Sequence, residues 1–505
     1  MAVARPRPRT RRETLNTSWP WRVRDALAAQ PRALWACTAV GLAHALVWAA
    51  LIPTFQGPDE PVHVGYTQYI AETGDLPRPL SPYYTPPEDA DALFGSLRWS
   101  LTEDPNWSPA HHRDLVNTLD DPGLSREDER GAGYAANNPA LYYVLTALPY
   151  RAAAGRGLLD RIFAMRVFSA LFAAATVAFV FLFLRGLLPR HPWSWTIGSL
   201  AVALQPVAAF IGGTVNNDTM LWTASAALFW LVARGFRRGL TLPLGVAIGA
   251  ALATALLTKG GSYGLVPGTV VALAVMFWRA GEGRRRALVA GVASLAVVAM
   301  TFGAWVLASR YVFDRAGTSV TGGAIQPENA PLTVGGYLSY LWQTFLPPLS
   351  FMRDWFSEPR ALPVWDVYFQ GFVGRFGWFQ FGFPPWVNWV GLAVVAVLAL
   401  LAAKSLLDAR VAVLRRRGEL VAYLAFAVGM LFVVTAAGYR ARVLDSVDFE
   451  QTRYLFPLLP LWGAFVVLAV RGAGRFYRAA GVLVIAVLGI HAVHSVLLTL
   501  ARYYA

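Results

Sequence analysis

Two adjacent carboxylates, Asp59 and Glu60, follow an almost uninterrupted apolar run in the stretch GPDEPVH, residues 57–63. A carboxylate at such an edge can accept a proton from a hydroxyl group as that group attacks a substrate. Glu60 would then orient the acceptor, or the two acids would hold a divalent cation with His63, one helical turn after Asp59. The alternative is that Asp59 simply caps the helix that begins here, because aspartate is a preferred N-cap residue.

A third acid, Asp218, lies in the short stretch GGTVNNDTM, residues 212–220, between two apolar segments. It reads either as a helix cap, with Asn216 and Asn217 forming the preceding turn, or as a second carboxylate that faces the acidic pair across a helix bundle. The spacing leaves both readings open. The second reading predicts that Asp218 supports the same site as Asp59.

A lysine stands at the end of another apolar segment, in LLTKGGSYGL, residues 256–265. Gly260 and Gly261 follow this residue, Lys259, and let other groups approach the backbone closely. A lysine beside flexible backbone amides is typical of a phosphate site. The alternative is a lysine that extends its amine along apolar surface to the membrane boundary.

Arginines at helix ends are further candidates for phosphate binding. Arg453, next to Tyr454, enters an apolar segment in DFEQTRYLFPLLPLW, residues 448–462. Its guanidinium can bind a phosphate with two hydrogen bonds, or the two side chains can anchor the helix at headgroup depth. The same two readings apply to Arg375, in GRFGWF, and to Arg166, near the start of another helix.

The composition is that of a polytopic membrane protein. Of the 505 residues, 56% are hydrophobic and only 15% are charged, whereas soluble proteins carry about 25% charged residues. Several apolar runs reach the length of roughly 18 residues that can cross a bilayer. The net charge of +14 must therefore be interpreted by its position along the chain. We expect the membrane, and no nucleic acid, as a partner.

The apolar segments predict an all-α fold of about eleven transmembrane helices. The basic, proline-rich stretch 1–33 shows no cleavage site beside the first apolar run, so we expect a cytoplasmic tail and a retained first helix. The predicted spans are 34–54, 162–184, 194–213, 219–233, 241–257, 263–278, 287–308, 385–402, 419–437, 455–470 and 479–500.

The stretch NNPALYYVLTALPYRAAAG, residues 137–155, decides the topology. If it does not cross, the arginine-rich loops all lie on the cytoplasmic side, as the positive-inside rule requires. The segment is also short and rich in aromatic residues, which suits a helix at the membrane interface. We therefore expect an outer-face juxtamembrane helix, a cytoplasmic N-terminus and an outer C-terminus.

This topology places the acidic pair at the outer face, in the first of two long outer loops, 55–161 and 309–384. Long loops tied to a rigid bundle are more often functional than idle. The sequence thus predicts one module over 34–470 that includes both loops, followed by a last loop and helix over 471–505. We expect Asp59, Asp218 and Lys259, with Arg375 or Arg453, to line one outer-face cavity.

The order of these elements resembles the GT-C superfamily of membrane glycosyltransferases, which includes protein O-mannosyltransferases and bacterial aminoarabinose transferases. The chain is more closely similar to an uncharacterised bacterial membrane-protein family related to them. The resemblance covers about 34–470. It rests on PDEPVH after the first helix, NPALYY, Arg166, Asp218, TKG and QTRYLFPLLP. Aminoarabinose transferases carry a lysine before the proline of the juxtamembrane helix, where this chain has Asn138.

The resemblance implies an inverting transfer of sugar from a polyprenyl-phosphate donor to an acceptor hydroxyl of a cell-envelope glycan, lipid or protein. Asp59 would be the catalytic base, supported by Glu60 and Asp218, and no cofactor would be required, although a divalent cation remains an option. The implied donor-phosphate contacts are Lys259, Arg375, Arg453 and Arg166. The alternatives are a lipid or glycolipid transporter or flippase, and an inactive binding protein of the same fold.

Overall fold

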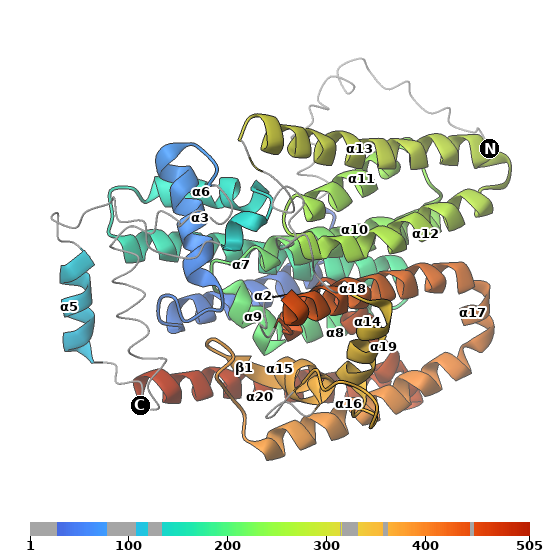
Figure 1. The fold of residues 1–505 in the computed structure, drawn as a ribbon. Helices are drawn as coiled ribbons and strands as arrows, with labels where there is room; N and C mark the ends of the chain where they lie inside the picture. Colours follow the sequence, from blue (N-terminus) through green and yellow to red (C-terminus); the bar gives the residue numbers. More distant parts are fainter. Residues whose placement is uncertain are drawn as a thin grey trace, which may run out of the picture.

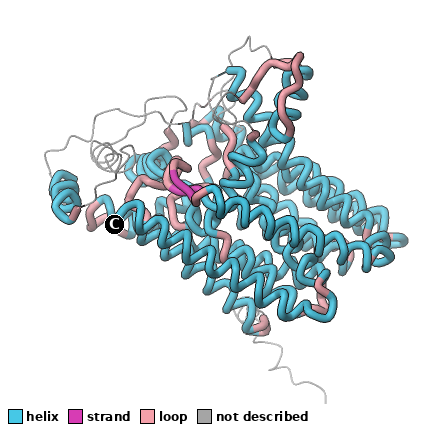
Figure 2. The backbone as a smooth tube through the Cα atoms, turned by 90° about the horizontal axis from the view of Figure 1, so that it is seen from below, coloured by secondary structure: helices cyan, strands magenta, loops and turns pink. Residues whose placement is uncertain are grey.

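The computed structural model describes residues 28–77, 108–119, 134–313, 315, 332–356, 362–444 and 449–505. Nearly all of this part of the chain is helical, and its one sheet is a pair of two-residue strands (Figure 2). The helices pack into a bundle around one large cluster of buried apolar side chains. The ring of Trp48 in α2 (Arg32–Leu51) stacks on that of Phe376, with centroids 4.8 Å apart, and its centroid lies 5.4 Å from that of Phe210. The fold class is therefore the all-α polytopic one that the sequence predicts.

Eight helical segments of the described chain are long and apolar enough to cross a membrane. They are α2, α7 (Leu158–Leu187), Gly260–Arg279 with α12 (Leu265–Arg279), Gly281–Tyr311 with α13 (Arg284–Tyr311), α16 (Pro385–Asp408), α18 (Arg417–Leu444), Thr452–Gly472 with α19 (Leu459–Gly472), and Gly474–Tyr504 with α20 (Tyr477–Tyr504).

The other three expected spans are also helical, but none of them is a single helix that is both long and apolar enough to cross a membrane. The segment 194–213 is a bent pair, α8 (Pro192–Ala203) and α9 (Pro206–Gly212), which meet at 62° and raise the number of candidate spans to nine. Pro206 supplies no backbone N–H to continue the first helix. α10 (Asp218–Arg238) carries charge at both ends, and α11 (Leu242–Leu256) has only 15 residues. The structure therefore does not confirm a count of eleven.

The described parts of the first long loop contain three short α-helices and a 3₁₀ turn: α3 (Glu60–Thr73), α5 (Pro109–Leu119), the turn (Tyr134–Asn137) and α6 (Leu141–Ala152). α6 is the predicted juxtamembrane helix. It lies against α3 at one end of the bundle (Figure 1). Tyr143 of α6 stacks on Tyr66 of α3 with ring centroids 3.9 Å apart, inside a second apolar core.

The second long loop contains α14 (Val334–Phe345), a π-helical turn (Val364–Phe369) and α15 (Gln370–Gly374). The strand pair follows, with β1 (Arg375–Phe376) antiparallel to β2 (Phe381–Gly382). The sequence did not predict these strands. They bring Phe376 into the main core and place Trp378 beside the end of α2, where its indole N–H donates to the Phe55 carbonyl at 2.9 Å.

One end of the bundle carries arginines in the last turns of three helices. Arg237, Arg279 and Arg471 lie in the last turns of α10, α12 and α19. At the opposite end the segment after α11 meets the start of α10, where Lys259 pairs with Asp218. The C-terminal turn of α20 lies beside the end of α2, where Tyr504 donates to the carbonyl of Leu51. Tyr503 of α20 donates to Gln56, just after α2. The predicted site residues therefore lie at the bundle end away from these arginines.

Candidate functional site

The site is built around a strained turn that follows α2. Pro53 and Pro58 break the helical backbone, and both Phe55 and Asp59 adopt left-handed conformations, with φ of 66° and 64°. In the described chain the only other non-glycine residue with positive φ is Phe379, at 60°. Such conformations cost about 1–2 kcal/mol each and persist only where the surrounding structure enforces them.

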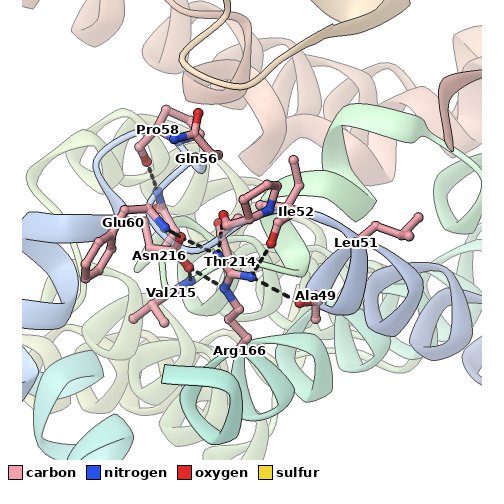
Figure 3. A network of polar contacts seen from close by, with 12 residues as sticks. Ala49, Leu51, Ile52, Gln56, Pro58, Glu60, Arg166, Thr214, Val215 and Asn216 are labelled. Atoms are coloured by element: carbon pink, nitrogen blue, oxygen red, sulfur yellow. Dashed lines mark hydrogen bonds and ion pairs between the residues drawn. The ribbon is translucent and has the colours of Figure 1, made fainter. Parts of the chain in front are cut away.

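The buried carboxylate of Glu60 holds this turn to the bundle. Arg166 of α7 donates from Nε to Oε1 at 2.7 Å and from Nη2 to Oε2 at 2.6 Å. The backbone N–H of Val215 donates to Oε1 at 3.1 Å, and that of Phe55 donates to Oε2 at 2.9 Å. Figure 3 shows Glu60 and Arg166 facing one another within this network. Glu60 thus accepts four hydrogen bonds with no exposed surface.

Arg166 is equally occupied. Its remaining donors bind the carbonyl oxygens of Ala49 and Ile52 at 3.1 and 2.7 Å and of Pro53 at 3.1 Å (Figure 3). A guanidinium has five N–H donors, and all five are used here. A phosphate contact by Arg166 would break this network, so we assign Arg166 and Glu60 to the support of the turn rather than to the phosphate and acceptor roles expected from the sequence.

Asp59 occupies the N-cap position of α3, yet its side chain makes no capping hydrogen bond. The left-handed backbone turns its carboxylate away from the Glu60 network, and Oδ2 accepts a hydrogen bond from Nη2 of Arg453. Arg453 is fully buried, whereas the Asp59 side chain is 18% exposed. The structure thus contradicts two alternatives drawn from the sequence. The Asp59 side chain does not cap α3, and the Arg453 side chain is buried in the protein rather than extended to the membrane boundary.

Asp218 and Lys259 continue this chain of ion pairs. Nζ of Lys259 donates to Oδ1 of Asp218 at 2.7 Å, and Nε of Arg453 lies 3.5 Å from Oδ2 of Asp218. Asp218 is in the first turn of α10, where the helix dipole favours negative charge. The order Asp59–Arg453–Asp218–Lys259 therefore alternates in sign and joins four segments that are distant in sequence.

An aromatic ring lies beside both cations of this chain. Nζ of Lys259 lies 5.0 Å from the ring centroid of Tyr454, and the Arg453 guanidinium carbon lies 5.3 Å from it. The Lys259 side chain is only 17% exposed. Burial, only partly offset by Asp218, lowers the pKa of Lys259 below its usual range. Lys259 therefore differs from a lysine that extends freely to the membrane surface.

His63 lies near the same charges but does not form the metal group considered from the sequence. Its Nδ1 is 2.9 Å from the hydroxyl of Tyr143, and Glu60 is engaged by Arg166. The described residues contain no group of three His, Cys, Asp or Glu side chains that could hold a metal ion. Asp59, Glu60 and His63, although close in sequence, therefore point to different partners.

The remaining predicted residue, Arg375, donates to Gln370 at 2.7 Å, within its own segment. Two residues that the sequence interpretation did not assign to the site do take part in it. Gln451 accepts a hydrogen bond from Nε of Arg453 at 2.6 Å. Asn216 donates to the carbonyl of Pro58 at 3.2 Å. Their positions two residues before Arg453 and Asp218 were the only available signal. The predicted cavity around the charges stays a prediction.

An apolar pocket of about 450 Å³ adjoins the segment that carries Arg453. It is lined mainly by aromatic and aliphatic side chains, including Tyr368, Phe372, Val395, Thr452, Phe456 and Trp462. Thr452 precedes Arg453 directly, and its hydroxyl donates to the carbonyl of Tyr368 at 2.6 Å. The structure therefore places apolar space next to the charged chain.

Comparisons with known proteins identify the family. No curated protein sequence matches the chain. The apo oligosaccharyltransferase of Archaeoglobus fulgidus and the oligosaccharyltransferase AglB of that organism, in complex with an inhibitory peptide and a dolichol-phosphate, each show 13% identity and a TM-score of 0.42. These alignments cover 94% and 93% of this chain, which spans 56% of the length of either one. A family model described as "Predicted membrane protein (DUF2142)" matches residues 42–462, and the chain belongs to that family.

Proposed function

We propose that the protein is a membrane glycosyltransferase. It moves a sugar from a polyprenyl-phosphate donor to an acceptor hydroxyl of a cell-envelope glycan, lipid or protein, with inversion, at the outer face. The observation that carries this proposal is the buried chain Asp59–Arg453–Asp218–Lys259 at one end of the bundle. It combines a partly exposed carboxylate with two cations beside an apolar pocket.

The two cations suit the leaving group. A phosphate that departs from a sugar needs its negative charge stabilised more than it needs a proton, and preorganised cations in a water-poor site supply that stabilisation. Arg453 can contact two phosphate oxygens at once, and Lys259 adds a point charge. Asp218 pairs with both side chains and so fixes their positions relative to one another.

Asp59 suits the role of base. In the proposed reaction the acceptor oxygen attacks the anomeric carbon, the bond from that carbon to the phosphate oxygen breaks, and the hydroxyl proton passes to an Asp59 oxygen. The products are the glycosylated acceptor and polyprenyl phosphate. In the structure Arg453 pairs with Asp59. Donor phosphate would compete for that guanidinium and free the carboxylate to accept the proton.

The apolar pocket suits the donor's lipid. Thr452, the residue before Arg453, is part of its lining, so a phosphate at Arg453 would place the first isoprene units beside Phe456 and Trp462. Burial of apolar chain contributes roughly 25 cal/mol per Å². The pocket would thus bind the lipid while Arg453 and Lys259 bind the phosphate.

The test is transfer in proteoliposomes that contain a polyprenyl-phosphate sugar, with wild-type protein beside Asp59→Asn. The matched control is Asp160→Asn, because Asp160 is an exposed acid at the start of α7. We expect product with wild type and Asp160→Asn and very little with Asp59→Asn. Movement of the intact donor across the bilayer without any transfer would favour the transporter alternative and reject this proposal.

A further inference from the structure

One buried side chain near the ionic chain is left with an unpaired nitrogen. His63 lies in the first turn of α3, and its backbone N–H donates to the carbonyl of Asp59 at 3.1 Å. Its ring is only 3% exposed. Nδ1 is 2.9 Å from the Tyr143 hydroxyl, while Nε2 is buried with no hydrogen-bond partner in the described chain. A buried polar atom without a partner is costly, which points to a partner that arrives from outside the protein.

The ring orientation of His63 is fixed. The rings of His63 and Tyr143 are stacked, with their centroids 5.8 Å apart. The ring of Tyr143 stacks in turn on that of Tyr66, with centroids 3.9 Å apart. Tyr143 is fully buried between α3 and α6. A ring held on one edge by a hydrogen bond and on one face by packing presents its other nitrogen in one direction, as a positioned binding group requires.

The four charged side chains that act on His63 have a net charge of zero. Asp59, Asp218, Lys259 and Arg453 all act on its ring, two negative and two positive. Burial, the largest effect, lowers the pKa of His63 to about 3; Lys259 and Arg453 also lower it, whereas Asp59 and Asp218 raise it. The imidazole is therefore neutral near pH 7. A neutral ring amid balanced charges does not attract an ion, so its ligand is an uncharged polar group.

The chemistry of imidazole indicates which uncharged polar group fits Nε2. If Tyr143 donates to Nδ1, Nε2 carries the hydrogen and is a donor; if Nδ1 donates, Nε2 is an acceptor. A hydroxyl group can donate or accept and satisfies either tautomer, whereas a carbonyl or an ammonium satisfies only one. Asp218 carries a second buried oxygen, Oδ2, without a hydrogen bond, beside Arg453. Buried polar atoms without a hydrogen bond on both residues suit a ligand with several hydroxyls.

We propose that His63 is a substrate-binding residue whose Nε2 hydrogen-bonds a carbohydrate hydroxyl, with Tyr143 as the residue that positions the ring. This inference rests on the proposed glycosyl transfer and specifies which side chain recognises the sugar. The hydroxyl belongs either to the donor's sugar ring or to the acceptor. Both sources share the same chemistry, and kinetic constants separate them.

Two substitutions at one position test the assignment. Glutamine extends its amide to about the place of Nε2, whereas asparagine reaches only about as far as Nδ1. If Nε2 binds a hydroxyl, His63→Asn loses the contact and His63→Gln keeps much of it. If His63 serves only to bond Tyr143, the order reverses. A lost hydrogen bond in a buried site is worth about tenfold in binding, so we expect a rise of about tenfold in KM for His63→Asn.

The measurements have two arms. The first is KM for donor at saturating acceptor and KM for acceptor at saturating donor; the one that rises identifies the source of the hydroxyl. The second is thermal stabilisation of the detergent-solubilised protein by a polyprenyl-phosphate sugar relative to sugar-free polyprenyl phosphate. For a hydroxyl on the donor, we expect this sugar-dependent increment to disappear in His63→Asn and to persist in His63→Gln.

The outcomes separate this inference from the proposed function. Transfer by both variants with unchanged kinetic constants overturns the His63 assignment and leaves glycosyl transfer standing. A sugar-dependent increment that requires His63, in a protein that transfers nothing, supports the binding residue and rejects the reaction. Wild-type protein with neither transfer nor a sugar-dependent increment overturns both. Tyr143→Phe, which keeps the ring packing, should show a smaller rise in KM than His63→Asn.

Discussion

The carboxylate of Asp59 pairs with the guanidinium of Arg453, a residue 394 positions later in the chain. The neighbouring acid, Glu60, pairs instead with Arg166. Two adjacent carboxylates thus have separate partners and separate surroundings, because the left-handed backbone at Asp59 directs them apart. Substitutions at the two positions should therefore have different consequences.

Asp59→Asn should remove activity and preserve the fold. Asparagine keeps the shape and an acceptor oxygen for Arg453, and it tolerates the left-handed conformation, but it cannot take the proton. We expect kcat to fall by roughly 10²-fold or more, with a thermal midpoint close to that of wild type. Full activity in this variant would remove Asp59 from the mechanism, and Asp160→Asn supplies the matched control.

Glu60→Gln should act on stability. It leaves the Arg166 charge buried without a counter-ion, and loss of one partner of a buried pair costs about 3–5 kcal/mol. Thermal denaturation of the purified protein should show a clear drop, and the yield of folded protein should fall. Glu282→Gln, at an exposed position in a short turn, should leave the midpoint unchanged. A normal midpoint for Glu60→Gln would contradict the supporting role.

The two lysines of the chain form a natural matched pair. Lys259 is 17% exposed and bound to Asp218, whereas Lys404 is 56% exposed and pairs with Asp408 on the surface. Lys259→Ala should raise KM for a polyprenyl-phosphate donor by about tenfold, the effect of one lost charged contact. Lys404→Ala should not change it. Equal effects, or none from Lys259→Ala, would show that Lys259 does not face the phosphate.

Stability should fall in mild acid because of His63. Its pKa is about 3 in the folded protein, against about 6.5 unfolded. Between these values the unfolded chain binds the additional proton, so acid favours unfolding by up to about 1.4 kcal/mol per pH unit. The thermal midpoint of wild type should therefore drop between pH 7 and pH 5. His63→Gln should drop less, and parallel curves for the two proteins would contradict the burial of a neutral ring.

The orientation in the membrane can be measured with introduced cysteines. Cys37, the only native cysteine, is buried and 1% exposed, so it should not react. Arg286→Cys, at the start of α13, should resist a membrane-impermeant maleimide added to intact cells, and Ala505→Cys should react. Labelling of residue 286 from outside would show that 137–155 crosses the membrane and would overturn the expected orientation.

The sequence predicted the helices well because apolar length and charge asymmetry are local properties. It predicted one continuous span over 194–213, and the structure instead bends at Gln205. Pro206 is visible in the sequence, but tertiary contacts complete the bend. The Gln205 side chain accepts from the N–H of Ala208 at 2.6 Å and donates to the carbonyl of Phe372 at 2.8 Å. Such a partner 167 residues away cannot be inferred from local pattern.

The same limit applies to the candidate site. Asp59, Asp218, Lys259 and Arg453 were all identified from their types and positions, and the structure brings them together. Arg166 and Arg453 looked alike in sequence, since each enters a helix from the same side. Only the three-dimensional contacts distinguish them: all five N–H donors of Arg166 are used to hold the turn, whereas Arg453 lies between two carboxylates.

The distance in sequence between Asp59 and Arg453 has a consequence for biosynthesis. Chains are made and inserted from the N-terminus, so Asp59, Asp218 and Lys259 enter the membrane region while Arg453 has not yet been synthesised. Until then one acid at the bundle end lacks its cation, and the Asp59 turn lacks the partner that fixes its carboxylate. The site therefore matures late in synthesis, and a chain truncated before residue 453 would insert most of its helices without ever acquiring it.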